Sequence, residues 1–287
     1  MTIPGLTIIG ESINDSVPST RKLYEANDMA GLKELARAQD EGGAVYIDVN
    51  VGQRPAAFLA EMVRQVQGVT ARPLSIDTPD PEMAEAALKA YDLERAGGRI
   101  PVLNSISPLR LEMFGLLRVL PFRPILMSSE RSVDGIGMAN RTAEEVHETA
   151  VELVREANRH GIPTSDCIID PAISPIGADS EGHLKRVVGA LRQMSADPFL
   201  KGAHYSVGLS NFTVMLPPKR ADGSPTKGPL ESAFLTTAMP LGLDMIIGSV
   251  KRKYEILAAD HPALQCLNDC LQLDGFDLLM RVQEYYG

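Results

Sequence analysis

Short apolar runs rich in β-branched residues alternate with longer amphipathic stretches along the whole chain. This alternation predicts repeated strand–helix units and a parallel sheet. Eight strands are predicted, at residues 7–10, 45–48, 73–77, 100–103, 124–127, 167–170, 204–208 and 245–248. Helices are predicted between several of them, at residues 28–41, 55–66, 81–91, 143–160 and 181–194.

The number of strand–helix units favours one fold class, a (β/α)8 TIM barrel. An open doubly wound sheet usually has fewer strands and a glycine-rich first turn. Gly135 and Gly137 are only a fragment of a dinucleotide-binding GxGxxG motif and do not directly follow a predicted strand, so we interpret residues 135–137 as a turn. Thr142 and Glu145 have the spacing of a capping box, which predicts a helix start at Thr142.

The domain organisation follows from the length of 287 residues. Barrels of this class commonly run as one unit of about 250 residues. We therefore expect residues 1–287 to form one barrel domain, in which residues 263–287 are a C-terminal helical segment with a turn at residues 274–275.

Composition excludes several classes of partner. The chain is 44% hydrophobic and 23% charged, carries a formal net charge of −9, and contains no Trp and no run of Lys or Arg. Nucleic acid is therefore not an expected partner. The chain has no apolar window of about 18 residues and no signal-peptide pattern at residues 1–5, so we expect no membrane segment and a cytoplasmic location.

The three cysteines are too few, and odd in number, for a disulfide framework. Cys266 and Cys270 are four residues apart with His261 nearby, but a fourth ligand and a CxxC pair are missing. We interpret the two thiols as one face of a helix and expect no metal site.

Polar residues follow most of the predicted strands, and in a TIM barrel the chemistry lies at these carboxyl ends. They are Glu11 and Asn14 on the first strand, Asp48 and Asn50 on the second, Asp77 on the third, Asn104 and Ser105 on the fourth, Asp170 on the sixth, and Ser210 and Asn211 on the seventh. Each of them alone could be a turn or helix-cap residue. Together they are carboxylates and carboxamides without a nucleophile, a set that suits a flat heterocycle with alternating hydrogen-bond donors and acceptors.

Other catalytic templates do not fit this sequence. It contains no GxSxG elbow, P-loop, HExxH or kinase motif. The histidines fall in predicted helices or at the starts of elements, and the lack of Trp disfavours a glycosidase.

Six ordered sequence blocks resemble one known family. They are residues 9–14, 42–52, 74–77, 104–105, 169–171 and 208–211, and residues 234–235 and 242–244 extend the similarity. In this order they are similar to the pterin-binding methyltransferases that pass a methyl group between tetrahydrofolate and a corrinoid protein. The resemblance implies a TIM barrel, a homodimer, and a pterin ring held by hydrogen bonds in the barrel mouth.

The resemblance also implies roles for individual residues. Asp77, Asn104 and Asp170 match the family's pterin ligands, and Asp48 and Asn50 lie on the neighbouring strand end. Asn211 matches a mobile Asn near N5 of the pterin and is the expected catalytic residue. Glu11 and Asn14 belong to the first-strand motif and are expected to line the same mouth.

The sequence departs from the family after the seventh strand. The family usually has a Gln three residues after the mobile Asn and an Arg shortly before a Pro-Leu pair, where this chain has Val214 and Gly228. The segment 212–228 is also longer. We expect a cation of this loop, Arg220 or Lys227, to replace the missing Arg or to contact the glutamate tail of folate, the alternative being a solvated loop.

The implied reaction is methyl transfer between N5 of tetrahydrofolate and the cobalt of a corrinoid. The altered loop favours the demethylating direction, toward methyltetrahydrofolate. The corrinoid-binding DxHxxG signature is absent, so cobalamin is expected to arrive on a partner corrinoid protein or free. Two alternatives stay open: a dihydropteroate synthase-like enzyme, although the opening and closing motifs of that family are missing, and a pterin-binding subunit without catalysis.

Overall fold

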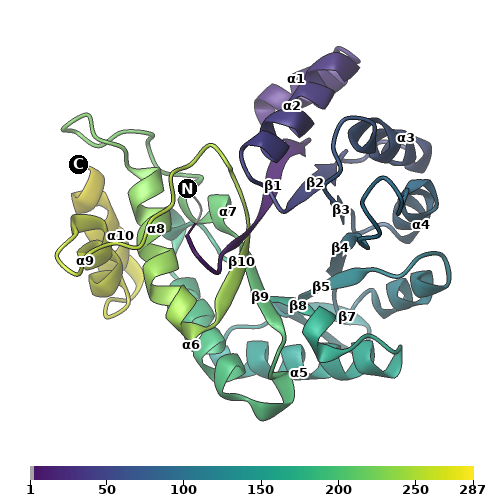
Figure 1. Ribbon diagram of the computed structural model, residues 1–287. Coiled ribbons are helices and arrows are strands. Elements are labelled where there is room, and N and C mark those ends of the chain that lie inside the picture. The colour runs from purple at the N-terminus through teal and green to yellow at the C-terminus, as the bar shows by residue number, and fades with distance from the viewer. Residues whose placement is uncertain (1–2) are drawn as a thin grey trace.

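The structure is a computed structural model that describes residues 3–287. Residues 1 and 2, part of the segment inspected above for a signal peptide, lie outside the described residues. Eight parallel strands form a closed barrel in the order β1-β10-β9-β8-β5-β4-β3-β2, seen along its axis in Figure 1. These strands are β1 (Thr7–Asn14), β2 (Tyr46–Asn50), β3 (Leu74–Asp77), β4 (Val102–Ile106), β5 (Arg123–Met127), β8 (Ile168–Asp170), β9 (His204–Gly208) and β10 (Leu243–Gly248). The predicted fold class and all eight predicted strands are confirmed.

Helices surround the barrel (Figure 1). They are α1 (Pro18–Glu25), α2 (Met29–Glu41), α3 (Ala56–Gln67), α4 (Pro81–Ala90), α5 (Ala143–Arg159), α6 (His183–Ala196), α7 (Leu209–Thr213), α8 (Lys227–Ala238), α9 (Pro262–Cys270) and α10 (Gly275–Tyr286). Short 3-10 helices occupy Leu111–Arg118, Thr164–Asp166, Ile176–Ala178, Pro198–Leu200 and Met239–Leu241. The five predicted helices agree with α2 to α6 within two residues at each end. The predicted capping box is confirmed, because Thr142 Oγ1 accepts from the Glu145 N–H while the Glu145 carboxylate accepts from the Thr142 N–H.

A hairpin that the sequence analysis missed follows β5. Strands β6 (Glu130–Val133) and β7 (Ile136–Ala139) pair antiparallel across a two-residue turn. Asp134 and Gly135 both have positive φ, at 52° and 80°, as a type I′ turn requires. The interpretation of residues 135–137 as a turn is therefore wrong for Ile136 and Gly137, which lie in a strand. The Asp134-Gly135 pair was the feature of the sequence that could have predicted this hairpin.

The core has two parts that together determine where a site can form. The larger part packs the outer faces of the strands against the helices. The smaller part joins buried side chains from five strands and fills the barrel interior: Ile9, Val102, Ile125, Ile168 and Met245. This apolar plug leaves only the next layer of inward-facing positions, at the carboxyl ends of the strands, free for polar side chains.

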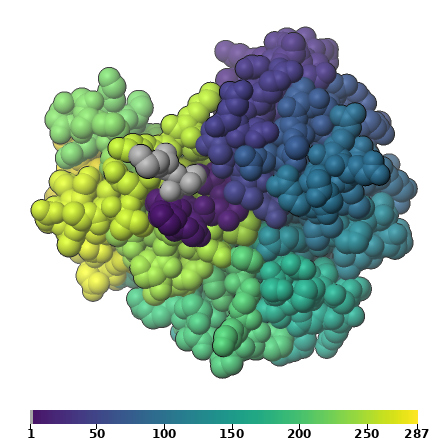
Figure 2. Space-filling view, viewed as in Figure 1, coloured from purple at the N-terminus to yellow at the C-terminus, as the bar shows by residue number. Residues whose placement is uncertain are grey.

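The C-terminal helices α9 and α10 pack against each other, and α9 packs against α8. Cys266 and Cys270 are free and fully buried on α9, and His261 caps that helix by accepting from the Ala263 N–H. Among residues 3–287, no group of three or more His, Cys, Asp or Glu side chains could hold a metal ion. Within the same part of the chain, no helix is both long and apolar enough to span a bilayer. In the space-filling view of Figure 2, the first described residues lie near the middle of the visible face.

Candidate functional site

A pocket of about 480 Å³ lies at the carboxyl ends of the barrel strands. Its lining comes from seven strands or their ends and from α7 and α8, so residues distant in sequence meet here. Seven predicted site residues line it: Glu11, Asn14, Asp77, Asn104, Asp170, Asn211 and Lys227. Three others, Asp48, Asn50 and Arg220, lie outside the lining. Met127 and Ile247 add apolar surface.

Asp77 is the last residue of β3 and has Asn104 as its register partner on β4. Asn50 donates from Nδ2 to Asp77 Oδ2 at 3.0 Å, while its own Oδ1 accepts from the Gly52 N–H at 2.8 Å. Asn50 therefore orients the Asp77 carboxylate from behind the pocket. Burial raises the pKa of Asp77 to about 6, against the opposing effect of the Asn50 hydrogen bond.

Asp170 ends β8, and the turn after it fixes its carboxylate. The Ala172 N–H donates to Asp170 Oδ1 at 2.7 Å, and Ala172 adopts a left-handed φ of 53°. The buried guanidinium of Arg186, on α6, donates to the Ala172 carbonyl at 3.0 Å and to the Asn140 carbonyl at 2.8 Å. Burial raises the pKa of Asp170 to about 7, although the Ala172 N–H lowers it.

Asp48 lies one layer deeper than Asp77. It is fully buried beside its register partner Ser75, and neither of its carboxylate oxygens has a hydrogen-bond partner among the described residues. Burial, together with the negative charges of Asp77 and Glu11, raises the pKa of Asp48 well above its usual range. An ionised carboxylate at this depth would be an unpaired buried charge, and the raised pKa reflects that cost.

Asn211 is carried by the short helix α7, directly after β9. Its Nδ2 lies so close to Gly208 that a Cβ at position 208 would approach it to 2.9 Å. The absence of a side chain at Gly208 therefore allows the Asn211 carboxamide to fold back over the strand end. The neighbouring Ser210 donates from Oγ to Glu11 Oε2 at 2.8 Å, which links α7 to β1.

Asn14 and Glu11 complete the β1 side. Asn14 Oδ1 accepts from the N–H and the hydroxyl of Ser16, at 2.9 and 2.7 Å, so its side chain shapes the turn that enters α1. Burial raises the pKa of Glu11, against the opposing effects of the Ser210 hydrogen bond and the Arg252 charge.

Two residues of this site have no counterpart in the sequence analysis. Arg252 follows β10 and lines the pocket, and its Nε lies 3.1 Å from Glu231 Oε2. Glu231, on α8, is fully buried and accepts from Thr213 Oγ1 at 2.5 Å. Burial raises the pKa of Glu231 to about 7, although Thr213, Arg252 and Lys227 pull it down. The sequence offered a weak reason to include Arg252 in the site, since it lies just past the eighth strand end. It offered none for Glu231, which is one residue of an ordinary helical stretch.

The two cations proposed from the loop 212–228 lie in different places. Lys227 begins α8, lines the pocket, and donates to the Val214 carbonyl at 3.2 Å. Arg220 donates to the Tyr285 carbonyl at 2.7 Å, and its guanidinium lies 4.7 Å from the centre of the Tyr285 ring. Arg220 thus fastens the loop to α10 instead of lining the pocket.

The pocket therefore has two chemically different sides. One side presents two carboxylates and a carboxamide without a counter-cation among the described residues, a set that accepts paired N–H donors from a planar ring. The other side presents the Asn211 carboxamide beside the cations Lys227 and Arg252, with the Glu11 carboxylate hydrogen-bonded to Ser210. A ligand that suits both has a donor-rich flat ring and an anionic extension.

Comparisons with known proteins agree with this geometry. The family described as pterin binding enzyme matches residues 15–248. A methylcorrinoid:tetrahydrofolate methyltransferase from Eubacterium limosum is 29% identical over 248 residues, which are 84% of this chain and 84% of that protein.

Solved structures of dihydropteroate synthases share the fold. The enzyme from Thermus thermophilus in complex with 6HMPPP has a TM-score of 0.59 and 21% identity, covering 92% of this chain and 93% of its own. The enzyme from Xanthomonas albilineans in complex with 7,8-dihydropteroate has a TM-score of 0.54 and 17% identity, covering 95% and 96%. At these identities the likeness concerns the fold alone. Since the family match spans most of the chain, the predicted relationship is confirmed, and the chain belongs to the pterin binding enzyme family.

Proposed function

We propose that this enzyme transfers a methyl group from the cobalt of a methylated corrinoid to N5 of tetrahydrofolate. The observation that carries the proposal is the convergence of Asp77, Asn104, Asp170 and Asn211 on one pocket. The Eubacterium limosum relative is named for the same pair of substrates. The direction, toward methyltetrahydrofolate, is part of the proposal.

The acidic side of the pocket supports binding of the pterin ring. The pyrimidine edge of a pterin presents an N–H and an amino group side by side, and a carboxylate accepts from both. Asp77 and Asp170 supply two carboxylates, and the Asn104 carboxamide offers one donor and one acceptor to the rest of the ring. Lys227 is suitably charged for the carboxylates of the folate tail. Lys227→Met should therefore weaken binding of tetrahydrofolate and leave binding of a tail-free pterin unchanged.

We assign Asn211 the role of assisting at N5. In the reaction the N5 lone pair attacks the methyl carbon, the cobalt–carbon bond breaks with both electrons going to cobalt, and N5 becomes a positively charged ammonium. The Asn211 carboxamide oxygen would accept a hydrogen bond from this N–H+ before the proton leaves to water, which stabilises the charge that develops in the transition state. The fixed pocket would also hold the ring in line with the incoming methyl group.

The proposal extends to the state of the enzyme in the cell. The corrinoid is delivered by a separate corrinoid protein or as free cobalamin, and residues 1–287 act as one barrel domain in a cytoplasmic homodimer. Size-exclusion chromatography with light scattering tests the dimer, and co-purification with a corrinoid-loaded partner tests delivery.

The reaction itself is tested by mixing enzyme, tetrahydrofolate and methylcobalamin without oxygen. Conversion of the methyl-Co(III) absorbance to that of cob(I)alamin, with formation of methyltetrahydrofolate, is the expected result. Condensation of p-aminobenzoate with a pterin pyrophosphate would identify a dihydropteroate synthase-like enzyme instead. Folate binding without turnover of either kind would identify a pterin-binding subunit.

A further inference from the structure

The helix that carries Asn211 is too short to be stable without contacts to the rest of the fold. Helix α7 has five residues, and no side chain caps its N-terminus at Gly208. Isolated helices shorter than about 12 residues are marginal in water. The placement of α7 therefore depends on contacts with the rest of the fold.

Some of these contacts are apolar and some are polar. Leu209 and Phe212 are buried, and the Phe212 ring lies 5.3 Å from that of Phe234 on α8. The polar contacts start at Ser210 and Thr213, which are three residues apart and so lie on one side of the helix. Apolar packing holds the helix down, but directional hydrogen bonds are needed to fix its rotation and therefore the direction of Asn211.

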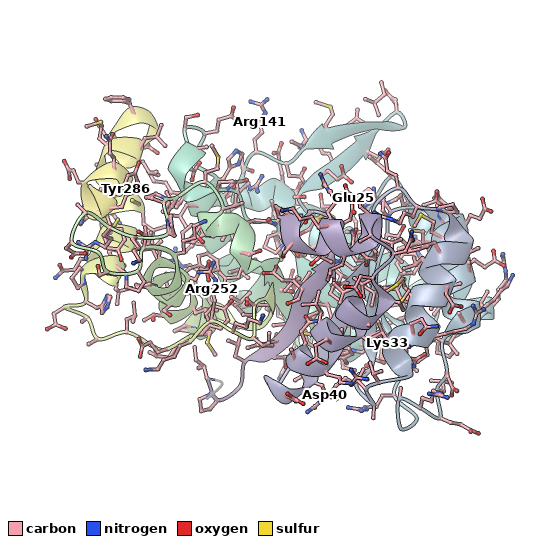
Figure 3. All side chains as sticks on the ribbon, turned by 90° about the horizontal axis from the view of Figure 1, so that it is seen from above. Glu25, Lys33, Asp40, Arg141, Arg252 and Tyr286 are labelled. Atoms are coloured by element: carbon pink, nitrogen blue, oxygen red, sulfur yellow. The ribbon has the colours of Figure 1, made fainter. Side chains whose placement is uncertain are left out.

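Thr213 contacts the carboxylate of Glu231, which has no exposed surface. Both Thr213 and Glu231 are fully buried, and the hydroxyl donates to Glu231 Oε1. The second oxygen, Oε2, faces Arg252 Nε at 3.1 Å. Arg252 is labelled in Figure 3, and its contact with Glu231 joins the segment after β10 to α8. A buried carboxylate with a single guanidinium partner is costly unless its other oxygen is also hydrogen-bonded, and the Thr213 hydroxyl supplies that hydrogen bond here.

We propose that Glu231, held by Arg252, is a positioning residue for Asn211, because it anchors α7 through the Thr213 hydroxyl. The role of Asn211 in turnover rests on the proposed function, whereas the anchoring of α7 does not. Asn211 lies between the two anchored residues, Ser210 and Thr213, so loss of one anchor lets the carboxamide swing while the acidic side of the pocket stays intact.

Thr213→Val is the test variant, because it keeps the shape of the side chain and the Glu231–Arg252 pair but removes the hydroxyl. Thr213→Ser should restore the wild-type behaviour. Thr237→Val is the matched control, since Thr237 donates only to the Ala233 carbonyl within α8. Amide hydrogen exchange of residues 209–214 in the free protein should become at least about tenfold faster in Thr213→Val and stay unchanged in Thr237→Val. Unchanged exchange in Thr213→Val would overturn the anchor.

Turnover then tests the positioning role. Thr213→Val should lower kcat about tenfold with KM and the folate Kd changed less than about twofold. In an Asn211→Ala background, Thr213→Val should have almost no further effect on kcat. Both substitutions remove the same interaction, that of the Asn211 carboxamide with the reacting atom. Additive losses, or a parallel loss of folate binding, would overturn the proposal. If the wild-type protein shows no methyl transfer, the proposed function fails, and the exchange measurement still decides whether the anchor exists.

Discussion

The two sides of the pocket are built in different ways. On the acidic side, Asp77 and Asp170 end strands of the barrel and receive hydrogen bonds from Asn50 and from the Ala172 backbone. On the α7 side, Asn211 belongs to a five-residue helix that side-chain hydrogen bonds tie to β1 and to α8. The acidic side is built into strand ends, which suits binding, whereas the α7 side is a short helix held through side chains, which suits assistance of a reacting atom. Binding and turnover should therefore be separable by mutation.

The largest effect is expected from Asp170→Ala. Removing the carboxylate leaves ring donors of the ligand without a partner, and each lost hydrogen bond to a charged group costs about 1.5–3 kcal/mol. The tetrahydrofolate Kd should rise about 100-fold or more in isothermal titration calorimetry. Asp244→Ala is the control, because Asp244 pairs with His204 at the opposite ends of the strands. Wild-type affinity in Asp170→Ala would show that the acidic side does not bind the ring.

Asn211→Ala should have the opposite effect, a loss of turnover with folate affinity almost unchanged. Loss of one group that acts on the developing charge lowers kcat by about 100-fold, while the ring contacts remain, so the folate Kd should change less than about threefold. Stopped-flow absorbance of the corrinoid and fluorescence titration of folate give the two quantities. Equal losses in kcat and affinity would mean that the two sides are not functionally distinct.

The acidity of the binding side should appear as a pH dependence of affinity. The ligand donors require ionised carboxylates, and the pKa values of Asp77 and Asp170 in the free protein are raised to about 6 and about 7. Protons therefore compete with folate as the pH falls through this range, and the Kd should rise at least about tenfold between about pH 8 and pH 5.5. Asp77→Asn and Asp170→Asn should each flatten part of the curve. A Kd independent of pH in the wild type would contradict ionised carboxylates as the ring ligands.

The contrast between the sides also explains what the sequence could and could not predict. Asp77, Asn104 and Asp170 follow apolar strand runs, and parallel strands bring such positions to one rim, so their convergence was predictable. Glu231 lies on α8 and Arg252 in the segment after β10, and only the packing of that segment against α8 brings them together. The place of Arg220 was unpredictable for the same reason, because its partner Tyr285 comes from the far end of the chain.

The smallest effect concerns the turn that fixes Asp170. Ala172 has a φ of 53°, and a left-handed conformation costs a residue with a Cβ about 1–2 kcal/mol. Glycine avoids this cost but is more flexible when unfolded, so Ala172→Gly should raise the free energy of unfolding by no more than about 1 kcal/mol. The N–H to Asp170 remains, so folate affinity should not change.

Ala172→Val provides the matched comparison, since a β-branched residue is a genuine outlier at positive φ. In urea unfolding, Ala172→Val should lower the free energy of unfolding by more than Ala172→Gly raises it. A loss of affinity in Ala172→Gly at unchanged stability would mean that the turn confers rigidity that binding needs, and the acidic side would then resemble the α7 side more closely than its hydrogen bonds indicate.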